Sequence, residues 1–211
     1  MRARPGSSLL LGLLLGAPAC VSKPAVGTQI YALDPPPIRA STPAAGARIV
    51  SVSRVEVAPQ FASRSLTYRS GPHSFERDPY ATLAAPPREL VLAMLRAALA
   101  NADFVREVVE PGGPVTPEVL VEAYLSDLEG DFTVPDKPVA VVALEMVVLP
   151  LPPSPEPVTS TLRKAYLRRL PLAERSAAAV ANAWNEGLTG MVEEFIADTR
   201  AALLPPGPAV R

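Results

Sequence analysis

The sequence predicts an α/β protein of the α+β type, in which a mixed or antiparallel sheet packs against two main helices. Apolar positions follow a helical period in two segments and a strand period in several others. Turns rich in proline and glycine separate these segments. Because a chain of 211 residues is long enough to bury a substantial core, we expect one globular domain.

Two segments have the spacing of amphipathic helices. Residues 87–101 begin at a proline pair, which a helix tolerates in its first turn. The apolar residues of this segment share one helical face: Leu90, Val91, Met94, Leu95 and Ala98. In residues 172–203 the large apolar residues step by three or four positions: Val180, Trp184, Leu188, Met191 and Phe195. The second stripe predicts a long helix that closes the fold and packs into the core.

Shorter segments predict the strands. Residues 49–58 are rich in β-branched side chains, and residues 66–70 and 73–77 flank a Gly-Pro turn, which indicates a hairpin. Residues 104–109 predict a short strand. Residues 158–168 mix apolar and charged side chains, which is typical of a half-exposed strand at the outside of a sheet.

The strand expected at residues 118–129 changes its character part-way. Apolar residues alternate as far as Leu125, after which Asp127, Glu129 and Asp131 occupy the same parity. Either the strand passes beyond the edge of the core there, or a bulge switches its face. We interpret the three carboxylates as a solvated strand face, since the glycine and the terminal glutamate of a calcium loop are missing.

Residues 138–149 are apolar at both parities except at Glu145. Alternating strands have one buried face, whereas a continuous apolar run is typical of a strand buried on both faces. The pattern therefore predicts a strand near the centre of the sheet that is covered on both sides.

The N-terminus has the layout of an export signal. Two arginines precede an apolar run at residues 9–15, and small residues follow up to Ala19. The run is shorter than the roughly 18 residues of a membrane span. Cys20, the sole cysteine, comes next; a buried free cysteine or an incidental one in an ordinary signal peptide are the alternatives to a lipidation site. Because residues 17–20 resemble a lipobox, we expect residues 1–19 to be removed and Cys20 to be lipidated.

The segment after the cysteine has the composition of a tether. Residues 20–47 are rich in proline, serine, threonine, alanine and glycine, which bury too little apolar area to offset backbone ordering. We expect the folded domain at residues 48–204 and a disordered tail at residues 205–211. Val21 stands where lipoproteins retained in the inner membrane of enteric-type bacteria tend to have aspartate, which favours the outer membrane.

Composition and motifs argue against several classes of function. The 20 basic and 21 acidic side chains give a formal net charge of −1, so the basic field that nucleic-acid binding requires is missing. His73 is the only histidine, and no G-x-S-x-G sequence accompanies it, so we expect no Ser/His/Asp triad. Phosphate-binding and dinucleotide-binding glycine motifs are also missing. We expect a protein that is not an enzyme and that needs no metal or cofactor.

Large apolar and aromatic side chains gather in the predicted hairpin and the loops beside it. Exposed, they could contact a partner or a lipid tail; buried, they would roof the sheet. We treat them as a candidate contact site: Phe61, Leu66, Tyr68, Phe75 and Tyr80.

Several motifs occur in an order that resembles a known family. A Tyr-x-Leu motif at residues 31–33 follows the cysteine, and the strand end at residues 55–59 leads into residues 61–69, which read FASRSLTYR. Residues 75–87 then precede the first helix, and the LEGDF motif at residues 128–132 precedes the next apolar strand. In this order, and after a lipidated cysteine, the motifs resemble the ABC-type transport auxiliary lipoproteins, the family of paraquat-inducible protein C.

The resemblance implies a role outside the cytoplasm. It implies a domain on the outer membrane that faces the periplasm and works with an inner-membrane permease, a cytoplasmic ATPase and an MCE-type substrate-binding protein. Such a system moves lipids or other apolar molecules between the membranes, with energy from the ATPase. Whether the subunits associate into a homo-oligomer stays open. A structural or assembly lipoprotein for a β-barrel or an envelope polymer is the alternative.

Overall fold

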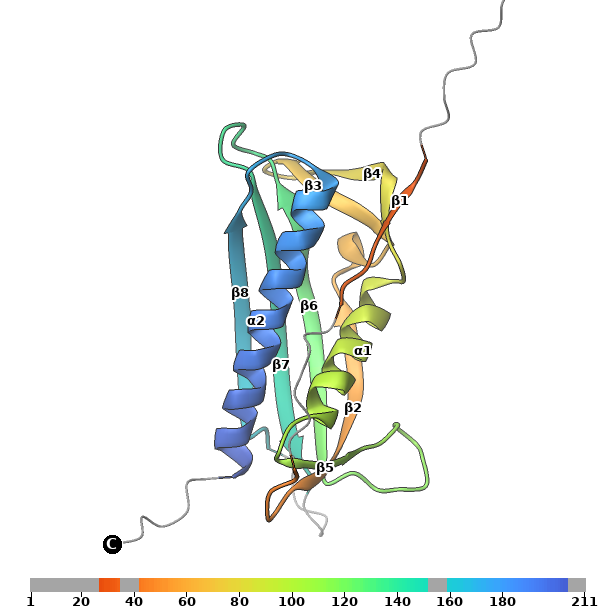
Figure 1. Ribbon diagram of the computed structural model, residues 1–211, viewed down its shortest axis with the longest axis vertical. Coiled ribbons are helices and arrows are strands. Elements are labelled where there is room, and N and C mark those ends of the chain that lie inside the picture. Colours follow the sequence, from red (N-terminus) through yellow and green to blue (C-terminus); the bar gives the residue numbers. More distant parts are fainter. Residues whose placement is uncertain (1–26, 35–41, 152–158, 205–211) are drawn as a thin grey trace, which may run out of the picture.

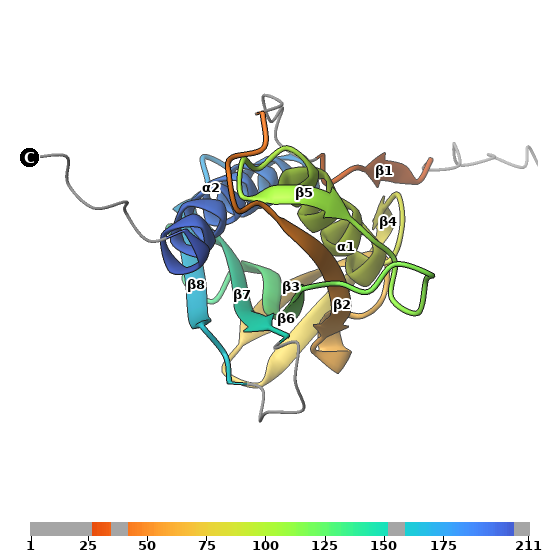
Figure 2. The same ribbon diagram turned by 90° about the horizontal axis from the view of Figure 1, so that it is seen from below.

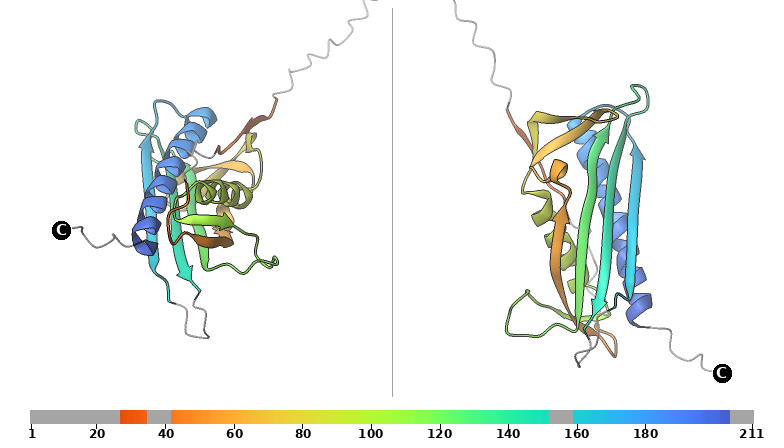
Figure 3. Two further views of the ribbon diagram at one scale, coloured as in Figure 1. Left: turned by 60° about the horizontal axis from the view of Figure 1, so that its bottom comes forward. Right: turned by 180° about the vertical axis from the view of Figure 1, so that it is seen from behind.

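The computed structural model describes residues 27–34, 42–151 and 159–204, which form an eight-stranded mixed sheet with two long helices on one face (Figure 1). Seen along the strands, both helices lie on the same side of the sheet (Figure 2). The view from behind shows the opposite face without a helix over it (Figure 3). The predicted fold class is therefore confirmed.

The elements follow one another in an order close to the predicted one. They are β1 (Gln29–Tyr31), β2 (Arg48–Val57), the 3₁₀ turn η1 (Pro59–Phe61), β3 (Ser65–Gly71), β4 (Ser74–Leu83), α1 (Pro87–Ala100), β5 (Val105–Val108), β6 (Val119–Asp131), β7 (Val139–Pro150), β8 (Leu162–Pro171) and α2 (Ala177–Leu203). The hairpin at the Gly-Pro turn and both helices are confirmed. Within the described residues, neither helix is both long enough and apolar enough to cross a bilayer.

Strand β6 is the branch point of the sheet. One of its edges pairs with β7 along its whole length, and β7 pairs in turn with β8, both antiparallel. On the other edge, the first part of β6 pairs in parallel with β2 up to Leu125, and its end pairs with β3 at Gly130 and Asp131. Beyond β3 the sheet continues through β4 to β1, while β5 lies outside β2. Strands β1 and β8 therefore lie at opposite edges (Figure 1).

A bulge in β6 decides between the two interpretations of its carboxylates. The register with β7 shifts between Leu125 and Asp127, so one extra residue turns the later side chains over. Leu128 and Gly130 then lie on the buried face, and Glu129 lies on the other. The strand therefore switches its face and does not leave the core.

Strand β7 departs from its prediction on one side only. Alternate residues from Ala140 to Val148 pack into the core under α2, as expected. Val141 and Val147 lie on the other face and are buried without a helix above them. In the neighbouring strands a glutamate and an arginine flank each of these valines, so the long side chains of β6 and β8 shield them. The strand is covered by a helix on one face and by its neighbours' side chains on the other.

The folded domain begins earlier than residue 48. Gln29–Tyr31 form β1, which pairs in parallel with β4, and Leu33 is buried in the core. The amide of Asp34 donates a hydrogen bond of 2.8 Å to Asn185 Oδ1 on α2. A strand of three residues is too short to show a period of two in its apolar positions. The sequence therefore predicts a tether for residues 20–47, and the structure corrects this for Gln29–Tyr31.

Helix α2 begins later than expected, at Ala177, because Ser176 caps it: the Ser176 hydroxyl accepts a hydrogen bond of 3.1 Å from the amide of Ala179. Further along, Gly187 allows the helix to approach the sheet closely. A Cβ atom at Gly187 would lie 2.8 Å from Val142 Cγ1 and 3.1 Å from Leu170 Cδ1. Glycine is therefore required by packing at this position.

Replacing Gly187 by alanine tests this contact. We expect Gly187→Ala to lower the free energy of unfolding by about 1–3 kcal/mol, because the added methyl group overpacks the interface between α2 and the sheet. Gly190→Ala is the matched control, since a Cβ there meets nothing within 4 Å and better helix propensity should stabilise by up to about 1 kcal/mol. Urea unfolding of the two variants measures the difference; equal effects would contradict the close approach.

Candidate functional site at the β3–β4 hairpin

The five residues of the candidate contact site do not form one surface. Phe61 and Leu66 are buried, Tyr68 is half-buried, and Phe75 and Tyr80 are exposed. Exposure therefore divides the five residues: Phe61 and Leu66 belong to the core, whereas Phe75 and Tyr80 lie exposed along β4. The two groups have different surroundings.

On the side of the hairpin that faces away from the helices, an aromatic pair meets a buried ion pair. The Phe61 ring packs edge-on against Phe75, with 5.9 Å between the ring centroids and an angle of 84° between the planes. The Arg69 guanidinium lies 4.6 Å from the centroid of the Phe75 ring. Its Nε and Nη2 donate hydrogen bonds of 2.6 and 3.1 Å to the two carboxylate oxygens of Glu129. The hairpin is thus held to β6 by a bidentate pair.

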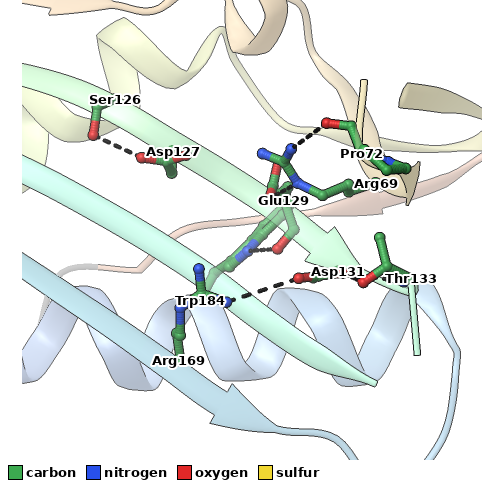
Figure 4. A network of polar contacts seen from close by, with 9 residues as sticks. All are labelled: Arg69, Pro72, Ser126, Asp127, Glu129, Asp131, Thr133, Arg169 and Trp184. Carbon is green, nitrogen blue, oxygen red and sulfur yellow. Dashed lines mark hydrogen bonds and ion pairs between the residues drawn. The ribbon is translucent and has the colours of Figure 1, made fainter. Parts of the chain in front are cut away.

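Glu129 connects three elements (Figure 4). Its side chain, only 2% exposed, binds Arg69 of β3, and its backbone carbonyl accepts a hydrogen bond of 3.2 Å from Trp184 Nε1 of α2. Burial raises the pKa of Glu129 above its usual value, while the hydrogen bond to Glu129 raises the pKa of Arg69. The expectation of a solvated carboxylate is wrong for Glu129, because its partner comes from a strand 60 residues earlier.

On the helix side of the hairpin, Tyr68 fixes the shape of β4. Its ring stacks on Phe132 at a centroid distance of 5.0 Å, and its hydroxyl donates a hydrogen bond of 2.7 Å to Asp78 Oδ2. Burial, followed by the hydrogen bond to Asp78, raises the pKa of Tyr68, so its hydroxyl stays neutral. The other oxygen of Asp78 accepts hydrogen bonds of 2.8 and 2.9 Å from the amides of Tyr80 and Ala81. Asp78 thereby holds the irregular part of β4.

The edge of the sheet beside this irregularity carries an apolar residue that sequence reasoning missed. Ile30 of β1 pairs with Thr82 of β4 and is 65% exposed, and Tyr80, two residues before Thr82, is 52% exposed. The composition of residues 20–47 predicts a tether, and Ile30 lies within that range. The adjacent Tyr-x-Leu motif at residues 31–33 was the available signal that this stretch folds onto the domain.

Two shallow grooves near strand β2 share Arg54, Glu56 and Tyr124 in their linings. One has a volume of about 190 Å³, and most of its lining residues are charged: Arg54, Glu56, Glu122, Glu145 and Arg163, with Ala123, Tyr124 and Val147. The second, of about 510 Å³, extends past Arg54 and Glu56 to Arg88 and to Pro59. The charged lining of the first groove suits polar contacts better than an acyl chain.

The opposite edge strand, β8, is tied to α2 by ion pairs. Lys164 Nζ lies 2.8 Å from Glu194 and 2.7 Å from Asp198, and Arg168 lies 2.6 Å from Glu194. The Tyr166 hydroxyl also donates a hydrogen bond of 2.7 Å to Asp198. The hydrogen bond from Lys164 lowers the pKa of Asp198 and that of Glu194. Charges along an exposed edge also discourage unwanted strand pairing.

His73 lies exposed in the turn between β3 and β4. In the part of the chain that the structure describes, no group of three or more His, Cys, Asp or Glu residues is placed to hold a metal ion. Cys20, the leader and the tail at residues 205–211 lie outside the described residues.

The family model for the ABC-type transport auxiliary lipoprotein component matches residues 31–196 of this chain. The chain belongs to this family. Members are lipoproteins, which attach to a membrane, and the family is an auxiliary component of ABC transport. No curated protein matches the sequence.

Two crystal structures share the fold of this family member. A Xanthomonas campestris protein of the DUF330 family is 19% identical, with a TM-score of 0.68 over 83% of this chain and 96% of its own. An uncharacterized protein is 10% identical, with a TM-score of 0.61 over 82% of this chain and 99% of its own. The whole length of each relative therefore corresponds to this domain.

Removing the guanidinium of Arg69 tests how far the buried pair stabilises the fold. We expect Arg69→Met to lower the free energy of unfolding by about 3 kcal/mol, because Glu129 would be left buried and unpaired. Arg54→Met is the matched control, since Arg54 and Glu56 form an exposed pair and should contribute less than about 1 kcal/mol. Adding Glu129→Gln to Arg69→Met should recover part of the loss. Equal losses in the Arg69 and Arg54 variants would contradict this account.

Acid should weaken the contact between β8 and α2. The folded-state pKa of Asp198 is depressed, so its contribution to stability is present above the unfolded-state pKa of about 3.9 and is lost as the pH falls through the folded-state value. Between about pH 7 and pH 3, the wild-type protein should therefore lose more stability than Lys164→Met. Replacing the exposed Lys137 by methionine is the control and should keep the wild-type pH dependence. Chemical unfolding at each pH measures both variants.

Proposed function

We propose that this chain is a non-catalytic lipoprotein, anchored in the outer membrane through Cys20 and facing the periplasm, that serves an MCE-type ABC transport system. The system would move lipids or other apolar molecules between the inner and outer membranes. Its other components would be an MCE-type substrate-binding protein, a permease and an ATPase. Family membership over residues 31–196 is the observation that carries this proposal.

The N-terminal sequence supports the membrane attachment. An arginine-containing start, a short apolar run at residues 9–15 and small residues up to Ala19 place Cys20 where a processed lipoprotein begins. Two or three acyl chains at one residue bind a membrane far more stably than a single chain does. Val21 in place of aspartate supports outer-membrane sorting.

The shape of the domain supports a role in docking. The interface between α2 and β7 is filled by large side chains such as Trp184 and Phe195, and the smaller groove beside Tyr124 has a mostly charged lining. An acyl chain gains most from an apolar, enclosed site. We therefore assign this subunit to positioning the transport system at its membrane, with the cargo carried by another component.

Affinity purification from native membranes tests the partner. With a C-terminal tag and crosslinking before detergent extraction, we expect the MCE-type protein of the same system to co-purify, and an unrelated tagged lipoprotein of the same membrane is the control. Recovery of barrel-assembly or polymer-synthesis proteins instead would favour the structural alternative. Failure to recover any transport component after crosslinking would contradict the proposal.

Lipidation is tested at Cys20 itself. Labelled palmitate should enter the wild-type protein and be lost completely in Cys20→Ser, because the chain has one cysteine and the acyl chains require its thiol. Intact-mass analysis should show a mature chain that begins at residue 20. Label that persists in Cys20→Ser would disprove the anchor.

A further inference from the structure

We propose that the face of β1 and β4 that carries Ile30 and Tyr80 lies against the surface of the membrane that holds the anchor. The inference rests on the lipidation of Cys20 in the proposed function and adds an orientation for the domain. We call Ile30 and Tyr80 the apolar patch, and the lipid surface is what contacts it.

The patch has the chemistry of a membrane interface. Ile30 and Tyr80 are 65% and 52% exposed, which leaves two large side chains in water at the same edge of the sheet. Ile30 lies opposite Thr82, and Tyr80 is the diagonal neighbour on the same face of β4. An aliphatic side chain gains by entering the apolar layer, and a tyrosine is suited to the headgroup level because its ring is apolar and its hydroxyl is polar.

The fold presents these side chains rigidly. Ala81 and Leu83 alternate with Tyr80 and Thr82, and both are buried in the core. Asp78 holds the amides of Tyr80 and Ala81, while the amide of Ala84 donates a hydrogen bond of 2.7 Å to the carbonyl of Tyr31. The exposed side chains therefore cannot turn inward without breaking this part of the sheet.

The length of the chain before β1 keeps the patch near the membrane. Seven peptide links join Cys20 to Gly27, and a fully extended chain of seven residues spans at most about 25 Å. The chain enters the domain at β1, so the edge that carries Ile30 is the part of the fold nearest to the anchor. Strand β8 lies at the opposite edge of the sheet (Figure 1). The acyl chains at Cys20 would hold the domain at the membrane, and Ile30 and Tyr80 would only have to set its orientation relative to the lipid surface.

Tryptophan fluorescence in vesicles tests the orientation. The native Trp184 is buried and gives a constant background, so Tyr80→Trp adds the exposed tryptophan that reports on the patch. The lipidated full-length protein is reconstituted into phosphatidylethanolamine and phosphatidylglycerol vesicles that contain phosphatidylcholine brominated in the upper part of its acyl chains. Leu167→Trp on β8 is the matched control, because Leu167 is 53% exposed. Ile30→Trp is a second reporter at the same patch.

We expect brominated lipid to quench Tyr80→Trp and Ile30→Trp, with a blue shift of their emission, and to leave Leu167→Trp unchanged. Adding Ile30→Asp to Tyr80→Trp should remove most of the quenching without changing the midpoint of unfolding. If the protein floats with the vesicles but both patch reporters stay as unquenched as Leu167→Trp, the orientation is wrong while lipidation stands. If a soluble quencher reaches the patch equally with and without vesicles, the patch is free for a protein partner and the inference also fails. If the wild-type protein does not float, lipidation and the orientation fail together.

Discussion

The bulge between Leu125 and Asp127 in β6 is the constraint on which the rest of the structure depends. Before it, β6 pairs with β2; after it, the strand turns its later residues over and pairs with β3. Because of this switch, Gly130 faces α2 and the side chain of Glu129 faces the hairpin. A Cβ at Gly130 would lie 3.0 Å from both Tyr68 Cδ1 and Val180 Cγ2, so a glycine is needed where hairpin, sheet and helix meet. One extra residue thus allows two strands to share one edge of β6.

The local sequence was sufficient to predict the elements but not their long-range contacts. Both helices and most of the strands were predicted because periodicity is a property of neighbouring residues. The burial of Glu129 was not predictable, since it depends on Arg69, which reaches β6 only when the hairpin folds back. The bulge was recognised as an alternative, because a change of parity alone does not distinguish it from a strand that leaves the core.

The candidate site shows the same limit. Phe61, Phe75 and Tyr80 look equivalent in the sequence, yet Phe61 is buried against Phe75, and Tyr80 lies exposed in the irregular part of β4. Their exposure is set by Asp78, which fixes the path of β4, and by the way Arg69 covers the Phe75 ring. Ile30 escaped notice for a different reason: β1 has three residues, and its stability comes from pairing with β4 and not from its own pattern.

The two edges of the sheet differ in their charged contacts, and this difference bears on function. Strand β8 exposes Leu167 between residues that form ion pairs with α2, whereas Ile30 and Tyr80 lie together at the other edge. At Gly187 the interface between α2 and the sheet is closed to an apolar ligand, because even one added methyl group would lie 2.8 Å from Val142. An acyl chain could enter there only if α2 separated from β7, which would break the ion pairs that hold α2 to β8. Ile30 and Tyr80, by contrast, are exposed and can contact the surroundings without any movement of α2.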